Sequence, residues 1–322
     1  MPPFDPAVEP LVPVGPFRWR DGERLVVFGR GAAADAGELL EPGYALLTTA
    51  RAGVQAPEVL ERAAAVHEVA SGRVDELAGA LRPEVHGERL VALGGGRVID
   101  VAKALAAADP PRSVTAIPTT LSGAEMTSGH RHAAGVPAGT PGVRPANVIN
   151  DPALAASQSP EQLARSAGNA LGHAIEGPVT PLTNPVSALA AVSAVRLIAS
   201  GLAGRLEERD RDALALGALL AGYVIGSTGY GLHHIVSQTL ARFAGVAHGT
   251  ANTIMLPHTI GALAARAPEW NVRLGRALGA EPATLAEHVR ELAGLTGLGA
   301  AASRRRSSRP ASTRPRSARA SR

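Results

Sequence analysis

The sequence predicts two structural domains, an α/β domain built on a parallel sheet and an all-helical domain that follows it. Short apolar runs alternate with amphipathic helical stretches as far as residue 150, which is the pattern of strands joined by crossover helices. After Asp151-Pro152 the strand patterns stop, and alanine-rich helical patterns continue to about residue 296. A length of 322 residues is sufficient for two domains. We therefore expect an α/β domain over 1–154, a helical domain over 155–296 and a tail over 297–322.

In the first domain the predicted elements follow one another closely. Asp21-Gly22 separates two apolar runs and predicts a hairpin over 17–28. Beyond it, short apolar or β-branched runs predict strands, and apolar residues that recur every three or four positions predict helices. The predicted strands are 44–49, 90–93, 114–117 and 147–149, and the predicted helices are 32–40, 57–69, 74–81 and 97–107. Residues 122–146 are rich in glycine and polar residues and predict an irregular loop.

The second domain begins with a clear helix start. Ser159 precedes Pro160, and these residue types favour the cap and the first turn of a helix. Further helices are predicted over 186–201, 211–226, 233–243, 249–266, 268–278 and 284–295. In the tail, residues 303–322 are all Ser, Arg, Ala, Pro or Thr, which cannot build an apolar core. A disordered basic tail and a shifted reading frame in a GC-rich gene both explain this composition, and we favour the second.

Composition excludes several classes of protein. The chain has no cysteine, which rules out disulfides and thiolate metal sites and favours a cytoplasmic location. We find no signal peptide, and no apolar run approaches the ~20 residues of a membrane span. The net charge of +4 arises in the tail, because residues 296–322 hold eight arginines and no acidic residue. The rest of the chain is mildly acidic, so we expect no nucleic acid and no membrane among its partners.

The stretch 90–105 carries the first functional signal. A buried strand is expected to end at Gly94, Gly95 and Gly96, and an amphipathic helix follows them directly. This order lets backbone N–H groups approach a phosphate at a helix N-terminus, where a Cβ would block the approach. Lys103, the single lysine of the chain, lies on the same predicted helix. A retained ammonium indicates function there, and a surface lysine kept by chance is the alternative.

The second signal is a group of polar residues in the helical half. Asn169 and His173 are four residues apart and therefore share a helix face. His234 and His248 follow, fourteen residues apart. Three histidines and a side-chain oxygen are able to form a metal site. The alternative is that each is an ordinary core or surface histidine, since the chain has ten.

These motifs resemble the iron-containing alcohol dehydrogenase superfamily, and most closely its maleylacetate reductase branch. The resemblance runs from about Val26 to about Leu295 and rests on motifs at 26–29, 45–49, 94–103, 117–127, 150–152, 166–176, 184–185, 231–234 and 248–258. It implies a Rossmann-like first domain and a helical second domain in a dehydroquinate synthase-like arrangement. It also implies NAD(H) or NADP(H) as cofactor and a small-molecule substrate, and we expect a homodimer. Relatives continue with further helices where this chain has its Arg/Ser tail.

The resemblance also assigns cofactor-binding residues by position. Gly94, Gly95 and Gly96 are expected to hold the pyrophosphate of the dinucleotide. The cleft around it would be lined or organised by Thr48, Asp100, Lys103, Thr119, Thr120 and Ser122. Many relatives carry an acidic residue near the adenine ribose to repel a 2′-phosphate. Thr48 and Thr49 stand there in this chain, so we expect both NADH and NADPH to be accepted.

In the iron-dependent branch, the metal ligands would fall at Asn169, His173, His234 and His248. Position 169 is an aspartate in that branch, and the neutral amide of Asn is a poor ligand, so occupancy by iron or zinc is doubtful. Many relatives have a histidine at position 238, whereas Gln238 cannot shuttle protons. The proton donor would then be His173, His234 or His248. Asn169, Gln238, His130 and Arg131 are placed in the substrate pocket, where His130 or Arg131 would pair with a substrate carboxylate.

Three functions are therefore open. We favour an NAD(P)H-dependent reductase of maleylacetate or a similar unsaturated oxo-dicarboxylate, which yields 3-oxoadipate in the catabolism of aromatic compounds. A metal-dependent alcohol dehydrogenase that uses iron or zinc is the first alternative, and metal analysis separates the two. A truncated, inactive remnant is the second.

Overall fold

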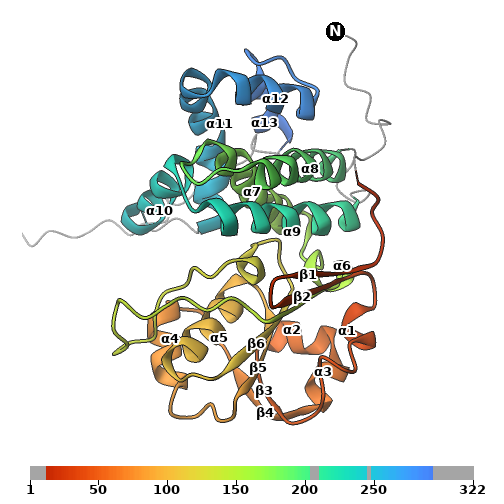
Figure 1. Ribbon diagram of the computed structural model, residues 1–322, viewed down its shortest axis with the longest axis vertical. Coiled ribbons are helices and arrows are strands. Elements are labelled where there is room, and N and C mark those ends of the chain that lie inside the picture. Colours follow the sequence, from red (N-terminus) through yellow and green to blue (C-terminus); the bar gives the residue numbers. More distant parts are fainter. Residues whose placement is uncertain (1–11, 204–209, 245–247, 293–322) are drawn as a thin grey trace, which may run out of the picture.

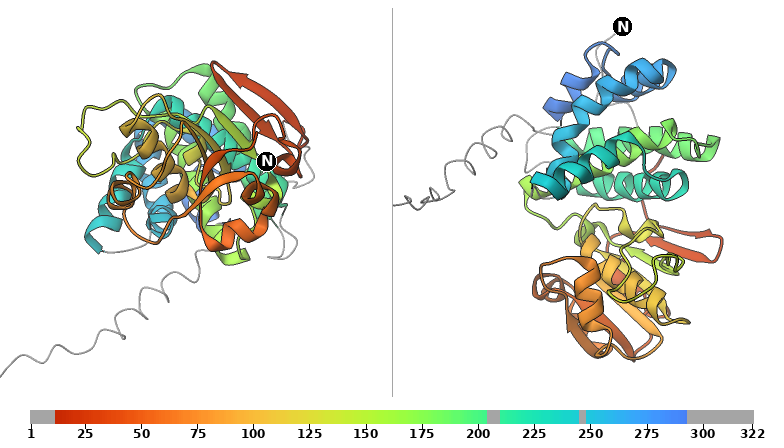
Figure 2. Two further views of the ribbon diagram at one scale, coloured as in Figure 1. Left: turned by 90° about the horizontal axis from the view of Figure 1, so that it is seen from below. Right: turned by 90° about the vertical axis from the view of Figure 1, so that its left-hand side faces the viewer.

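The computed structural model describes residues 12–203, 210–244 and 248–292. The tail predicted for 297–322 lies outside these ranges, and the side chain of His248 is also outside the described part. The described chain has two stacked parts, a sheet flanked by helices and a bundle of helices, which Figure 1 and the right-hand view of Figure 2 separate. This confirms the predicted fold class of a parallel-sheet α/β half followed by an all-helical half. The division at residue 154 stays a prediction.

The first half is built on a seven-stranded sheet with the order β1-β2-β7-β6-β5-β3-β4 (Figure 1). Its strands are β1 (Phe17–Asp21), β2 (Arg24–Phe28), β3 (Tyr44–Thr48), β4 (Ala63–Glu68), β5 (Arg89–Gly94), β6 (Ser113–Pro118) and β7 (Asn147–Asn150). The predicted hairpin is confirmed, because β1 and β2 pair antiparallel. The other neighbours pair parallel, so β3, β5 and β6 end at the same edge of the sheet.

Helices cover both faces of this sheet. On one face lie α1 (Ala32–Asp35), α2 (Ala50–Gln55) and α3 (Pro57–Glu61), and on the other lie α4 (Val74–Leu81) and α5 (Gly96–Ala108). Successive residues of one strand point to opposite faces. Accordingly, Leu46 belongs to the first core and Leu47 to the second. The α/β half therefore has a buried core on each side of its sheet.

The second half consists of helices packed around α7 (Pro160–Glu176). The others are α6 (Pro152–Ala155), α8 (Pro185–Leu202), α9 (Arg211–Thr228), α10 (Leu232–Ala244), α11 (His248–Arg266), α12 (Pro268–Leu278) and α13 (Leu285–Leu292). Ser159 caps α7 as expected, because its side chain accepts a hydrogen bond from the Gln162 N–H. Two short 3₁₀ turns, η1 (Ala124–Met126) and η2 (Gly177–Val179), complete the elements. In Figure 1, α9 lies on the side of the bundle that faces the α/β half.

Two predicted helices of the first half are corrected. The helix expected over 32–40 ends at Asp35, and Gly37 follows in a turn. The helix expected over 57–69 ends at Glu61, and the residues after it form the edge strand β4. The alanines of β4 carry no strand signal of their own, and pairing with β3 overrides their helical propensity.

One described helix, α8, is long and apolar enough to span a membrane by length and composition alone. Half of the tested window is buried inside the protein, and α8 packs closely against α7 and α9. These contacts are those of a core helix.

Candidate active site

The glycine turn lies where β5 passes into α5. Gly94 ends β5, Gly95 is the N-cap of α5, and no described side chain caps this helix. A Cβ on Gly94 would lie 2.5 Å from Val98 Cγ2, and one on Gly96 would lie 2.9 Å from Ser122 Oγ. Close packing therefore requires glycine at both positions. This reason is additional to the phosphate access expected from the sequence.

The other predicted cofactor residues gather around this turn. The Thr119 N–H donates to the Gly94 carbonyl (2.9 Å), and the Thr120 side chain would lie 3.0 Å from a Cβ on Gly95. At the neighbouring strand, the Thr48 hydroxyl donates to the Leu93 carbonyl (2.9 Å). These residues end or directly follow three adjacent parallel strands. They lie at the edge of the sheet where open α/β sheets bind ligands. Their binding of a dinucleotide stays a prediction.

Lys103 is fully buried and holds the loop that follows Ser122. Its Nζ lies 2.8 Å from Asp100 Oδ1 and 2.8 Å from the Gly129 carbonyl. It also donates to the Ala124 carbonyl (3.1 Å) and the Thr127 hydroxyl (3.3 Å). One acceptor lies on α5 itself, and the other three lie in the loop between residues 124 and 129. The alternative of a surface lysine is therefore excluded, and Lys103 positions the loop over α5.

This loop brings the two halves of the molecule together. Gly123 has a φ of +72°, which favours glycine, and a Cβ there would lie 3.0 Å from the Gly222 Cα of α9. The same Cβ would lie 3.4 Å from His173 Nδ1. The loop that starts at Ser122, next to the glycine turn, therefore reaches His173 of the helical half at its second residue.

Two of the three predicted histidines meet at this junction. The rings of His173 and His234 stack with centroids 4.6 Å apart and planes 23° apart, and both residues are buried. His234 comes from α10, and its Nδ1 lies 2.5 Å from Glu176 Oε2 on α7. The ring of Tyr230 also packs against His234, at a centroid distance of 4.9 Å. His248 begins α11, but its side chain is outside the described part.

Asn169 is buried one turn before His173 on α7. Its Oδ1 accepts a hydrogen bond from Asn252 Nδ2 on α11, at 2.5 Å. The oxygen of the Asn169 side chain thus has a neutral hydrogen-bond partner. Asn169 lies beside the histidine pair, as its spacing predicts.

Three other predicted pocket residues are placed differently. Gln238 is exposed one turn after His234 on α10. His130 Nε2 accepts a hydrogen bond from the Val143 N–H (3.2 Å), and this bond joins two parts of the loop that contains both residues. Arg131 is exposed. Burial lowers the pKa of His130, and the bond to the Arg131 carbonyl partly offsets this shift. A role of these three residues in substrate binding stays a prediction.

The sequence alone predicts no role in the site for Glu176, Tyr230 or Asn252. Glu176 lies three residues after His173, so the helical period already placed it near the same face. Its partner His234 is 58 residues away in the chain, and only the fold shows that they meet. Asn252 similarly lies four residues after His248, which was a usable signal.

The described side chains at the junction offer His173, His234 and Asn169 as candidate metal donors. They contain no group of three or more His, Asp or Glu residues placed to hold an ion. Asn169 brings no negative charge, and its oxygen is engaged by Asn252. His234 Nδ1 is held by Glu176, which leaves Nε2 as the ring nitrogen that would face a ligand. Occupancy by iron or zinc stays a prediction.

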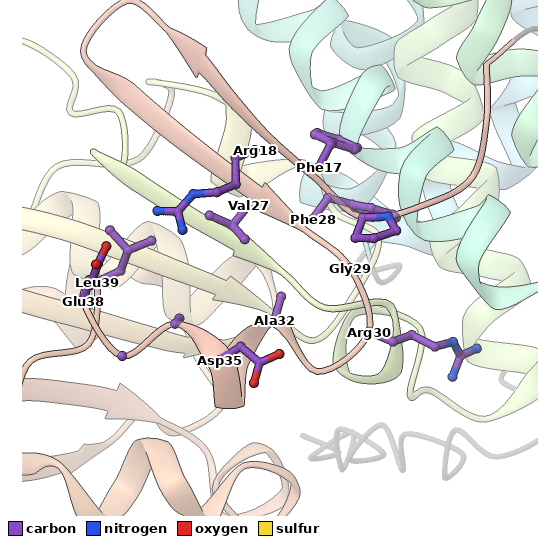
Figure 3. A pocket seen from close by; sticks show the side chains of 13 residues that line it. Phe17, Arg18, Val27, Phe28, Gly29, Arg30, Ala32, Asp35, Glu38 and Leu39 are labelled. Atoms are coloured by element: carbon purple, nitrogen blue, oxygen red, sulfur yellow. The ribbon is translucent and has the colours of Figure 1, made fainter.

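A separate cavity of about 560 Å³ lies at the other end of the sheet order, between the β1–β2 hairpin and α1 (Figure 3). Phe17, Phe28 and Leu39 line it together with Arg18 and Arg30, and none of the predicted site residues does. Arg30 points away from α1 toward the helical half in Figure 3 and pairs with Asp212 of α9. This cavity is distinct from the histidine junction.

Known proteins share long stretches of sequence with this chain. The pattern of the Fe-containing alcohol dehydrogenase family, C-terminal, matches residues 163–297. Maleylacetate reductase 2 of Cupriavidus pinatubonensis is 36% identical over 225 residues, which cover 67% of this chain and 62% of that protein. Maleylacetate reductase 1 of Rhodococcus opacus is 34% identical over 191 residues, which cover 56% of this chain and 52% of that protein. The matched part of the chain thus spans less than two thirds of these relatives.

Solved structures show the same fold over more of the chain. The crystal structure of maleylacetate reductase from Agrobacterium tumefaciens has a TM-score of 0.74 and 27% identity, and the match covers 88% of this chain and 87% of that one. An iron-containing alcohol dehydrogenase from Corynebacterium glutamicum has a TM-score of 0.74, 25% identity and 90% coverage of both chains. The chain belongs to the iron-containing alcohol dehydrogenase superfamily, and it is similar to maleylacetate reductases within it.

Proposed function

We propose that the protein is an NAD(P)H-dependent reductase of maleylacetate or a similar unsaturated oxo-dicarboxylate, which it converts to 3-oxoadipate. Two relatives that are named maleylacetate reductases support the substrate class. The observation that carries the proposal is the junction at Gly123, where one loop links the glycine turn to the histidine pair. We further propose a cytoplasmic homodimer that acts in the catabolism of aromatic compounds.

The residues around the glycine turn fit a dinucleotide. The N-terminus of α5 has no described side-chain cap, and helix N-termini favour phosphate groups. Gly95 and Gly96 would bind the pyrophosphate through the backbone, with Thr119, Thr120 and Ser122 beside it. When bound, the reduced dinucleotide supplies the hydride for the carbon–carbon double bond conjugated with the ketone.

The helical half would supply the proton. Hydride addition to a conjugated double bond leaves an enolate, which needs a proton at the neighbouring carbon. His173 and His234 lie at the junction, and His248 begins the next helix. The loop held by Lys103 would fix the position of the cofactor cleft relative to these rings.

The test is oxidation of NADH and NADPH by the purified protein with maleylacetate, after exhaustive chelation of metals. We expect turnover, with formation of 3-oxoadipate in equal amount to the cofactor oxidised. Absence of turnover, with activity that appears only when Fe²⁺ and an alcohol or aldehyde are added, would support the metal-dependent dehydrogenase instead. No activity under either condition would support an inactive remnant.

A further inference from the structure

We propose that Glu176 is the positioning residue that fixes His234 as the proton donor of this site, with Nε2 as the donating atom. The inference rests on the proposed function and selects one of the three histidines that the sequence left open. It follows from the surroundings of the two nitrogens of a single ring.

The first nitrogen, Nδ1, is held by a buried carboxylate. Glu176 Oε2 lies 2.5 Å from His234 Nδ1, and Glu176 Oε1 accepts from the His234 backbone N–H (3.3 Å). Both side chains are 1% exposed. Rotation of the ring would leave a buried carboxylate without its partner, which is costly. The carboxylate therefore sets the orientation of the ring and keeps a hydrogen on Nδ1.

The second nitrogen, Nε2, is buried and has no hydrogen-bond partner among the described residues. The rings of His173, Tyr230 and His233 pack around His234, at centroid distances of 4.6, 4.9 and 5.0 Å. Buried polar atoms are seldom left unsatisfied without a functional reason. With Nδ1–H fixed, Nε2 is the lone-pair atom of the neutral ring and the second N–H of the protonated ring. It is therefore the atom free to pass a proton to a substrate.

The proposed step adds one hydride and one proton to the substrate. The substrate double bond gains a hydride at one carbon, supplied by the reduced dinucleotide, and a proton at the other carbon from His234 Nε2. Two C–H bonds form, one π bond is lost, and the cofactor is left oxidised. The imidazole regains its proton from water. Glu176 forms and breaks no covalent bond in this step, and it holds the ring of His234 through Nδ1 and the backbone N–H.

The tautomer of His234 tests the proposal without any activity. In protein labelled with ¹⁵N-histidine, NMR at a pH where the ring is neutral distinguishes Nδ1–H from Nε2–H. We expect His234 in the Nδ1–H form in the wild type, and a shift toward Nε2–H in Glu176→Ala. His233 bonds through Nδ1 to the neutral Thr259 hydroxyl (2.9 Å) and serves as the internal control. An Nε2–H form of His234 in the wild type would overturn the proposal, even if the variant does not fold.

Kinetics provide the second readout. For Glu176→Gln we expect kcat with maleylacetate to fall about 10- to 100-fold, with an unchanged KM for the cofactor. Glu176→Asp should recover part of the loss. An unchanged kcat in Glu176→Gln would overturn the proposal. If the wild type itself does not reduce maleylacetate, the proposed function fails, while the NMR result still decides whether Glu176 positions His234.

Discussion

At the scale of single residues, Lys103 shows how one buried charge organises a loop. Its ammonium meets Asp100 and three acceptors between Ala124 and Gly129, and its side chain is fully buried. A buried ammonium is tolerated only when it is paired and hydrogen-bonded, and this environment provides both. The single lysine of the chain thus has a structural role, which its position on α5 alone did not reveal.

Replacement of Lys103 by Met should destabilise the fold by about 3 kcal/mol, because the Asp100 carboxylate and the loop carbonyls lose their shared donor. Urea unfolding measures the change in the free energy of unfolding. Arg97→Met on the same helix is the control, since Arg97 is exposed and should change stability by less than about 0.5 kcal/mol. Equal effects of the two substitutions would contradict this assignment of Lys103.

Glu125 is a buried ionisable residue of the loop that Lys103 holds. Burial raises its pKa to about 7, although its own backbone N–H, Lys103 and Arg24 act to lower it, and Asp100 acts to raise it further. Its Oε2 has no hydrogen-bond partner among the described residues. The folded chain therefore keeps the Glu125 carboxyl group protonated at a pH where the same group in the unfolded chain has lost its proton. Stability linked to Glu125 falls as the pH rises from about 4.5 to about 7.

Glu125→Gln should remove this dependence. A pKa difference of this size corresponds to about 3 kcal/mol at pH 8. We expect Glu125→Gln to melt close to the wild type at pH 5 and above it at pH 8, as measured by thermal unfolding in both buffers. A melting difference between the two proteins that does not change with pH would contradict the raised pKa.

The residue scale also shows what the sequence could reveal of the site. The spacing of Asn169 and His173 placed both on one helix face, and the structure confirms this. The pair of Glu176 with His234 and the pair of Asn169 with Asn252 join residues 58 and 83 positions apart. No local period encodes such contacts, because they depend on how α7, α10 and α11 pack.

At the scale of elements, the β5–α5 turn is set by close contact rather than by unusual backbone angles. Gly94 and Gly96 are not among the glycines with positive φ, but a Cβ at either position would meet a neighbour at less than 3 Å. At Gly94 the neighbours are the Cβ and Cγ2 of Val98, which belong to the first turn of α5. A side chain there would push the N-terminus of α5 away from the strand.

Gly94→Ala should therefore lower stability by about 1–3 kcal/mol and weaken protection by the cofactor. The measurement is the melting temperature with and without saturating NADH or NADPH. Gly37→Ala is the matched control, because a Cβ on Gly37 meets nothing within 4 Å. If Gly94→Ala retains the full melting shift on cofactor addition, the turn does not hold the dinucleotide.

The elements also show where prediction from sequence stops. The strands next to the site, β3, β5 and β6, were predicted because their apolar residues are buried on both faces. The edge strand β4 was predicted as helix, because three of its residues are alanine and most of the strand is exposed. Its conformation depends on hydrogen bonds to β3, which local sequence does not record.

At the scale of the whole molecule, the site depends on contact between the two halves. Gly123 packs against the Gly222 Cα, and the Met126 carbonyl lies 2.8 Å from where a Cβ on Gly226 would be. Arg24 of β2 donates to the same Met126 carbonyl (2.9 Å). The loop between Ser122 and Thr127 is thus fixed from the sheet side and from α9. It sets the distance between the glycine turn and the histidines.

Gly222→Ala should disturb this distance, since the new Cβ would lie 3.0 Å from both the Gly123 Cα and the Met126 Cβ. We expect kcat to fall by about 100-fold, because small misplacements of reacting groups slow a reaction by about this much. The Kd for the cofactor should stay within a few fold of the wild-type value. Gly261→Ala on α11, where a Cβ meets nothing within 4 Å, is the control and should retain activity. Equal kcat values for the two variants would contradict a functional junction.

Isotope tracing tests most directly that this junction transfers hydride to an unsaturated oxo-dicarboxylate. Chelated enzyme in ordinary water would be given maleylacetate and NADH or NADPH in which both hydrogens at C4 of the nicotinamide ring are replaced by deuterium. We expect one deuterium per molecule of 3-oxoadipate, as counted by mass spectrometry. Product without deuterium, or turnover that requires an added metal, would contradict the assignment.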